Sequence, residues 1–131
     1  MKNREKRSKR KLFNILVVDD ELMIRELLLN ILSINEEYQV KTAFDGEDAY
    51  GKFCIEEFDL ILSDHDMPNV NGIRLIRKAK KIAPGIKTIL MTGGDVESFR
   101  KEANKLKVNR CVQKPFLVNE ILDLVDKTLN E

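Results

Sequence analysis

The sequence predicts a single α/β domain, with a doubly wound parallel sheet of five strands and helices on both faces. Short β-rich apolar runs alternate with amphipathic helical patterns five times along the chain. Strict alternation of this kind implies parallel strands joined by right-handed crossovers. The chain has 131 residues, of which 43% are hydrophobic and 34% charged, and this suits one soluble domain with its own core.

The five strands are expected at 13–18, 38–43, 58–63, 87–91 and 110–113. They have the length and residue types of buried strands, and the run at 58–63 is almost continuously apolar, as expected for a strand covered on both faces. Four helices are expected at about 21–34, 45–55, 72–82 and 95–106, and a fifth is expected after the strand at 110–113.

Apolar spacing and terminal signals support each helix in turn. The first helix carries an apolar stripe of Ile24, Leu27, Leu28, Ile31 and Leu32. Asp45 is expected as the N-cap of the second, with Asp48 at the capping-box position. Pro84 ends the third helix, and a loop at Thr92-Gly-Gly precedes the fourth. The last helix is expected to have an inner, apolar face formed by Val118, Ile121, Leu122, Val125 and Leu129.

The formal charge is +1, but it is unevenly distributed. Residues 2–11 contain seven Lys or Arg against one Glu, so the remainder of the chain is net acidic. We expect residues 1–12 to be a disordered, solubilising basic arm. Binding of nucleic acid or an anionic surface is the alternative, although no aromatic side chain interleaves the charges for base stacking.

The two cysteines, Cys54 and Cys111, have no metal-ligand spacing and form no disulfide framework. A reducing cytoplasm is therefore the expected location. Cys54 is expected to be half-buried in the second helix, and Cys111 to be a small packing residue rather than a redox sensor. No apolar run reaches transmembrane length, and the basic start is not followed by a signal-peptide core.

Acidic residues follow two of the predicted strands at the point where each ends. Asp19 and Asp20 follow the first strand, and Asp64 follows the third. The carboxyl ends of parallel strands share one sheet edge, where ligands bind in such folds. Carboxylates gathered there would repel one another, so the pattern predicts a cation. Carboxylates and the backbone carbonyl of Asp66 suit Mg²⁺.

The fourth and fifth strands end in groups that complement a phosphoryl group. Asp64 is a candidate nucleophile for attack on phosphorus. The hydroxyl of Thr92 and the ammonium of Lys114 are then placed to neutralise charge on the transferring oxygens. Gly93 leaves the approach to Asp64 open. His65, the only histidine, is expected to be a loop side chain that tunes water access rather than a metal ligand.

Four motifs in this order carry a family resemblance: VVDDE, LSDHDMPNVNG, LMTGG and VQKPF. Over about residues 13–129 the chain resembles the receiver domain of two-component response regulators. The resemblance implies a flavodoxin-like (βα)5 fold with strand order 2-1-3-4-5, and a receiver domain at 13–131. Where the family usually carries Tyr or Phe three residues before the lysine, this chain has Cys111. The position that usually relays the switch to the face formed by the last two helices and strand 110–113 is therefore not aromatic in this chain.

The resemblance also implies a role for each site residue. Asp64 would accept a phosphoryl group from a histidine kinase phosphohistidine. Asp20 would bind Mg²⁺ directly, Asp19 through water, and Asp66 through its carbonyl, with Mn²⁺ expected to substitute. Thr92 would be the switch hydroxyl, and Lys114 would pair with the phosphoryl group.

The expected function is a phosphorylation-dependent signalling switch, not an enzyme with an external substrate. The expected partners are a sensor histidine kinase or phosphotransfer protein and an unidentified output protein. Neither nucleic acid nor membrane is expected to bind the domain itself, and a weak homodimer is left open. Whether the chain stands alone or belongs to a longer protein is also open. The alternatives are a pseudo-receiver that is never phosphorylated, and a haloacid-dehalogenase-type phosphohydrolase built on Asp64-His-Asp66.

Overall fold

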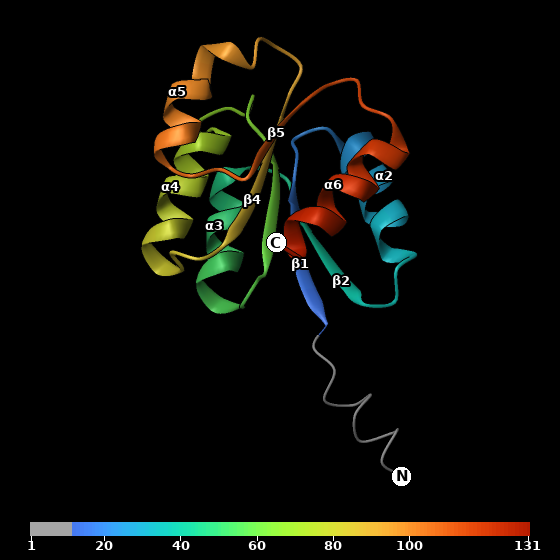
Figure 1. Ribbon diagram of the computed structural model, residues 1–131. Coiled ribbons are helices and arrows are strands. Elements are labelled where there is room, and N and C mark those ends of the chain that lie inside the picture. The colour runs from blue at the N-terminus through green and yellow to red at the C-terminus, as the bar shows by residue number, and fades with distance from the viewer. Residues whose placement is uncertain (1–11) are drawn as a thin grey trace.

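A five-stranded parallel sheet runs through the centre of the computed structural model, which describes residues 12–131 (Figure 1). The strands are β1 (Phe13–Val18), β2 (Tyr38–Ala43), β3 (Leu60–Asp64), β4 (Lys87–Thr92) and β5 (Arg110–Gln113). They lie in the order β2-β1-β3-β4-β5 and all four neighbouring pairs are parallel. The predicted fold class and strand order are therefore confirmed. The predicted basic arm lies outside the described residues, apart from the exposed Leu12.

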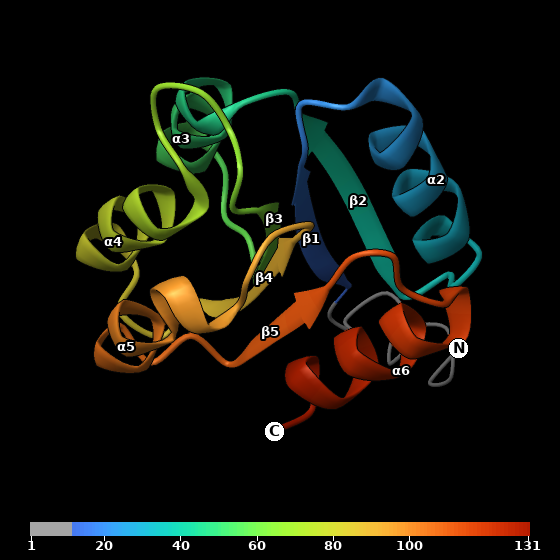
Figure 2. The same ribbon diagram turned by 90° about the horizontal axis from the view of Figure 1, so that it is seen from above.

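Within residues 12–131, five helices cover the two faces of this sheet. They are α2 (Leu22–Ser33), α3 (Gly46–Ile55), α4 (Gly72–Ile82), α5 (Glu97–Lys105) and α6 (Val118–Leu129). Helices α2 and α6 lie on one face, and α3, α4 and α5 on the other (Figure 2). Right-handed crossovers place α2 on the face opposite α3, α4 and α5, because the connection from β1 to β2 runs in the opposite direction along the sheet from the later ones. Among residues 12–131, no helix has the length and apolar character needed to cross a membrane.

The core is divided by the sheet, and β1 shows how its sequence serves both halves. Ile15 and Val17 face one cluster, whereas Leu16 and Val18 face the other, and all four are fully buried. Successive side chains of a strand point to opposite faces, so a strand covered on both sides reads as one continuous apolar run. The cluster on the α2 and α6 side contains Ile15, Val17, Leu28, Leu32, Tyr38, Leu60, Leu62, Ile89, Met91, Val112, Ile121, Val125 and Leu129.

Most predicted elements are confirmed to within two residues, but several burial predictions are wrong. Strand β3 begins at Leu60 rather than at residue 58. Leu27 is 39% exposed, because it lines a hollow that opens to solvent. Val118, the first residue of α6, is 41% exposed. Cys54 is exposed rather than half-buried, since the buried side of α3 is formed by other residues.

Local caps hold the loops that lead into α3 and α4. Asp45 accepts a hydrogen bond from the amide of Asp48 at 2.8 Å, so the predicted N-cap is confirmed. Asn71 caps α4 by accepting from the amide of Arg74 at 2.9 Å. Gly72, which follows Asn71 and begins α4, lies so close to β3 that an added Cβ would be 2.8 Å from the carbonyl oxygen of Asp64. Only glycine allows this approach, which positions the loop after β3.

Candidate functional site

The loops that follow β1, β3, β4 and β5 meet at the carboxyl edge of the sheet, at the top of Figure 1. A cavity of about 400 Å³ opens there. It is lined by Asp20, Glu21, Asp64, Asp66, Gly93 and Lys114. The structure therefore brings residues from four separate strand ends into one site, as the sequence predicts for an open parallel sheet.

Three carboxylates form the acidic part of this site. Asp19, Asp20 and Asp64 each offer one oxygen, and these oxygens lie within 4.8 Å of one another. The side chains of Asp19 and Asp64 are buried, whereas Asp20 is exposed at the mouth. A set of hard oxygen donors, of which one is open to solvent, fits Mg²⁺, which commonly retains several waters. The predicted role of the Asp66 carbonyl stays a prediction.

Lys114 supplies the positive charge of the site. Its ammonium lies 2.9 Å from Asp19 Oδ2 and 3.5 Å from Asp64 Oδ1. Its backbone amide donates to the carbonyl of Thr92 at 2.7 Å, which continues the pairing of β4 and β5, and its peptide bond to Pro115 is cis. Burial by itself would lower the pKa of Lys114, but the hydrogen bond and charge of Asp19, with the neighbouring carboxylates, raise it above the usual value.

The electrostatic environment of Asp64 is unusual for a carboxylate. Burial, followed by the charge of Asp19, raises the pKa of Asp64 to about 6, and Lys114 only partly opposes this. Asp64 is thus ionised at neutral pH, but its charge is poorly stabilised by the protein alone. Such a group is stabilised by a bound cation.

Thr92 is brought to the site, but its hydroxyl is already engaged. Its side chain is 1% exposed, and Oγ1 donates to Asp66 Oδ2 at 2.7 Å. The amide of Gly93 donates to the same oxygen at 3.3 Å, and the amide of Gly94 donates to Thr92 Oγ1 at 3.0 Å. This role of the Asp66 carboxylate was not predicted from the sequence, where only the backbone carbonyl of that residue was expected to take part. An added Cβ at Gly93 would meet nothing within 4 Å, so the approach is open.

Two further residues that support Asp19 were missed. The amide of Glu21 donates to Asp19 Oδ1 at 2.9 Å, and its own carboxylate lies 3.8 Å from Lys114. Arg25 donates from Nη1 to the backbone oxygen of Asp19 at 2.8 Å. Glu21 could have been found from its position directly after the acidic pair. Arg25 carries no local signal, since its contact depends on how α2 leaves the sheet.

His65 packs beneath α5, where burial lowers its pKa. Its ring centroid lies 4.1 Å from that of Phe99, with the planes inclined at 38°. Within residues 12–131, its Nδ1 is buried without a hydrogen-bond partner. Cys111 is partly buried against the same cluster as Phe99, as expected for a packing residue. The place where an aromatic relay residue would stand is therefore part of an apolar cluster under α5.

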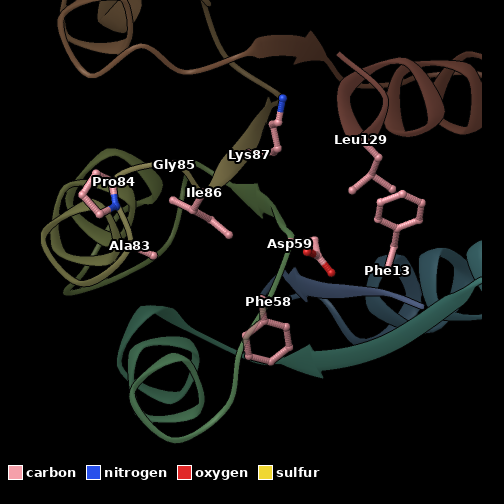
Figure 3. A pocket seen from close by; sticks show the side chains of 9 residues that line it. All are labelled: Phe13, Phe58, Asp59, Ala83, Pro84, Gly85, Ile86, Lys87 and Leu129. Atoms are coloured by element: carbon pink, nitrogen blue, oxygen red, sulfur yellow. The ribbon is translucent and has the colours of Figure 1, made fainter. Parts of the chain in front are cut away.

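A second cavity lies at the opposite, amino-terminal edge of the sheet (Figure 3). Its volume is about 370 Å³, and it is lined by Phe13, Phe58, Asp59, Ala83, Pro84, Gly85, Ile86, Lys87 and Leu129. None of the three clustered carboxylates lines it. The chemistry of the described chain is thus concentrated at the carboxyl edge.

Comparisons with known proteins agree with this geometry. The family model described as "Response regulator receiver domain" matches residues 15–126. Sporulation initiation phosphotransferase F of Bacillus subtilis is 36% identical over 115 residues, covering 88% of this chain and 92% of that protein. Sensor histidine kinase RcsC of Escherichia coli is 33% identical over 115 residues, 88% of this chain but only 12% of the kinase.

A solved structure adds a comparison in three dimensions. The response regulator protein TrrA of Thermotoga maritima, in complex with Mg²⁺ and BeF, is 34% identical, with a TM-score of 0.78. The match covers 89% of this chain and 99% of that one. The chain belongs to the family of response regulator receiver domains, which act as signalling switches in two-component systems.

Proposed function

We propose that Asp64 accepts a phosphoryl group in a Mg²⁺-dependent reaction, and that this modification switches the domain between two states. The observation that carries the proposal is the position of Asp64. Asp64 is 3% exposed, borders the carboxyl-edge cavity, and lies beside both the carboxylates of Asp19 and Asp20 and the ammonium of Lys114. A structural carboxylate would not need this arrangement, whereas a phosphoacceptor requires an attacking oxygen, a cation site and a positive partner.

The donor set suits one magnesium ion. Asp20, which is exposed, and Asp64 are the carboxylates best placed to hold it, because Asp19 Oδ2 is already paired with Lys114 at 2.9 Å. Asp19 would then act through water, as expected from the resemblance. When bound, Mg²⁺ would supply positive charge against the oxygens of the transferring phosphoryl group.

The reacting groups of the transfer are the carboxylate of Asp64 and the phosphohistidine of the donor. A carboxylate oxygen of Asp64 attacks phosphorus and forms a P–O bond, while the P–N bond of a phosphohistidine breaks. The electron pair of that bond remains with the leaving imidazole, which then takes up a proton. Lys114, now 3.5 Å from Asp64 Oδ1, is near enough to pair with the new phosphoryl oxygens.

An apolar surface beside the site favours a protein as the phosphoryl donor. A third hollow, of about 370 Å³ and adjacent to the acidic cavity, is lined by Ile24, Leu27, Gly93, Lys114, Pro115 and Phe116. It shares Gly93 and Lys114 with the acidic cavity. Leu22 and Met23, at the start of α2, are 57% and 83% exposed. A protein that brings its phosphohistidine to Asp64 would cover this apolar rim. A sensor histidine kinase or phosphotransfer protein has the required chemistry.

The test is the intact mass of the protein after incubation with acetyl phosphate and Mg²⁺, beside an Asp64→Asn variant. One added phosphoryl group that requires Mg²⁺ and is missing from the variant is the expected result. An unchanged mass together with no Mg²⁺ binding would instead indicate an interaction domain that is never phosphorylated. Continuous hydrolysis of a model phosphate ester would favour the haloacid-dehalogenase-type alternative.

A further inference from the structure

We propose that the carboxylate of Asp66 is a latch that holds the hydroxyl of Thr92 in the unphosphorylated state, so that a phosphoryl group on Asp64 must displace it. This regulation rests on the proposed phosphorylation of Asp64. It gives the side chain of Asp66 a positioning role that is separate from that of its backbone carbonyl.

The latch follows from the donor capacity of a hydroxyl. Thr92 has one hydroxyl hydrogen and can donate only one strong hydrogen bond at a time. That bond is directed to Asp66 Oδ2 at 2.7 Å, a short charge-assisted distance. The same hydroxyl cannot simultaneously donate to a phosphoryl oxygen on Asp64. The two acceptors therefore compete, and the Asp66 bond opposes the phosphorylated state.

The exposures of Thr92 and Asp66 allow the Thr92 hydroxyl to exchange Asp66 for a phosphoryl oxygen as its acceptor. Thr92 is 1% exposed, so its hydroxyl needs a partner inside the protein in either state. Asp66 is exposed, and its carboxylate can be solvated by water once it is released. The exchange thus leaves no buried polar group unsatisfied, provided that a phosphoryl oxygen takes the place of Asp66.

The latch also involves the backbone of the loop between β4 and α5. Asp66 Oδ2 accepts from the amide of Gly93 at 3.3 Å, and the Thr92 hydroxyl accepts from the amide of Gly94 at 3.0 Å. Moving the hydroxyl away from Asp66 therefore changes contacts along the segment that leads into α5. This connects the state of Asp64 to the loop without an aromatic side chain at Cys111.

The effect of the negative charge of Asp66 on phosphorylation must be distinguished from the effect of its hydrogen bond to Thr92. Asp66 borders the same cavity as Asp64, so its charge would also repel a phosphoryl group. Both effects disfavour phosphorylation, and removing Asp66 would relieve both together. A double-mutant cycle with Thr92 separates them, because charge repulsion does not need the Thr92 hydroxyl.

The experiment measures binding of beryllofluoride, a phosphoryl mimic, with Mg²⁺ by titration calorimetry. The proteins are the wild type, Asp66→Ala, Thr92→Val and the double variant, each checked for folding by circular dichroism. We expect Asp66→Ala to tighten binding about tenfold more in the Thr92 background than in the Thr92→Val background, a coupling of about 1.4 kcal/mol. Asp66→Asn is the matched control, because it removes the charge but keeps an acceptor, and it should recover part of the latch.

Equal effects of Asp66→Ala in the two backgrounds, to within twofold, would overturn the latch while leaving phosphorylation of Asp64 intact. If the wild type binds no beryllofluoride, the proposed function fails, and a second readout still tests the latch. In the metal-free protein, Asp66→Ala is expected to change the amide chemical shifts of Gly93 and Gly94, relative to the wild type, by much more than Asp66→Asn does. Unchanged amide signals in both variants would show that Asp66 does not hold the loop.

Discussion

Replacing Asp64 with Asn is expected to stabilise the metal-free protein at neutral pH and to leave its stability nearly unchanged below pH 4. Burial and then the charge of Asp19 raise the pKa of Asp64 from 3.8 to about 6 in the folded state. Between these values the folded protein keeps a proton on Asp64 that the unfolded chain has lost. The free energy of unfolding of the wild type therefore falls as the pH rises from about 4 to about 6, and then stays at the lower value.

The size of the effect follows from the shift in pKa. A shift of about two units, at about 1.4 kcal/mol for each unit, gives an upper limit of about 3 kcal/mol. The Asn side chain carries no charge that burial could penalise. The difference in stability between the variant and the wild type should thus grow from near zero below pH 4 to about 1–3 kcal/mol at pH 7.

Urea unfolding followed by circular dichroism, in EDTA and at pH values from 4 to 8, measures this difference. Asp123→Asn, on the exposed face of α6, is the control for the substitution itself. A difference that does not change with pH, or an Asp64→Asn variant that is less stable than the wild type at pH 7, would refute the reasoning. Adding Mg²⁺ should reduce the difference, because a ligand that binds only the folded wild type stabilises it.

Four further predictions concern the metal, Lys114 and two glycines. Mg²⁺ affinity, measured by calorimetry, should be about tenfold weaker at pH 5 than above pH 7, because protonation of Asp64 removes a ligand one unit below its pKa of about 6. Lys114→Ala leaves the buried carboxylates of Asp19 and Asp64 without the ammonium that neutralises them. It should lower the free energy of unfolding, measured by urea unfolding, by about 3 kcal/mol. Labelling by acetyl phosphate should also be slower. Gly72→Ala should destabilise the protein by about 1–3 kcal/mol, since its Cβ would meet backbone atoms. Gly51→Ala, where a Cβ meets nothing within 4 Å in helix α3, should instead stabilise it by about 0.5–1 kcal/mol in the same assay.

Local pattern predicted the elements, the parallel sheet and the edge at which the site lies, whereas the strand order was predicted from the resemblance to receiver domains. The strand at 13–18 and the helix at 72–82 agree with the structure residue for residue, because each combines one clear hydrophobic period with clear end signals. The carboxyl ends of parallel strands share one edge by topology. Asp64 and Lys114 were therefore predicted to meet, although 50 residues separate them.

Individual burial and pairing depended on neighbours that the local pattern does not specify. Leu27 lies on the predicted apolar stripe of α2, yet it is 39% exposed, because it borders an open hollow rather than the core. The displaced start of β3 reflects the same limit, since apolar residues before a strand can belong to a loop that packs on the core.

The sequence by itself determined the order of the elements, the edge at which ligands bind and the residues gathered there, because these follow from hydrophobic period and strand order. Only the tertiary structure decided how deeply Asp64 is buried, and with that its raised pKa. It also decided that Lys114 pairs first with Asp19, and that Asp66 holds Thr92. These contacts join residues 26 and 95 positions apart, and they depend on the path of four loops to within a fraction of an ångström. Hydrogen bonds and charge interactions vary steeply over such distances, so no local pattern can encode them.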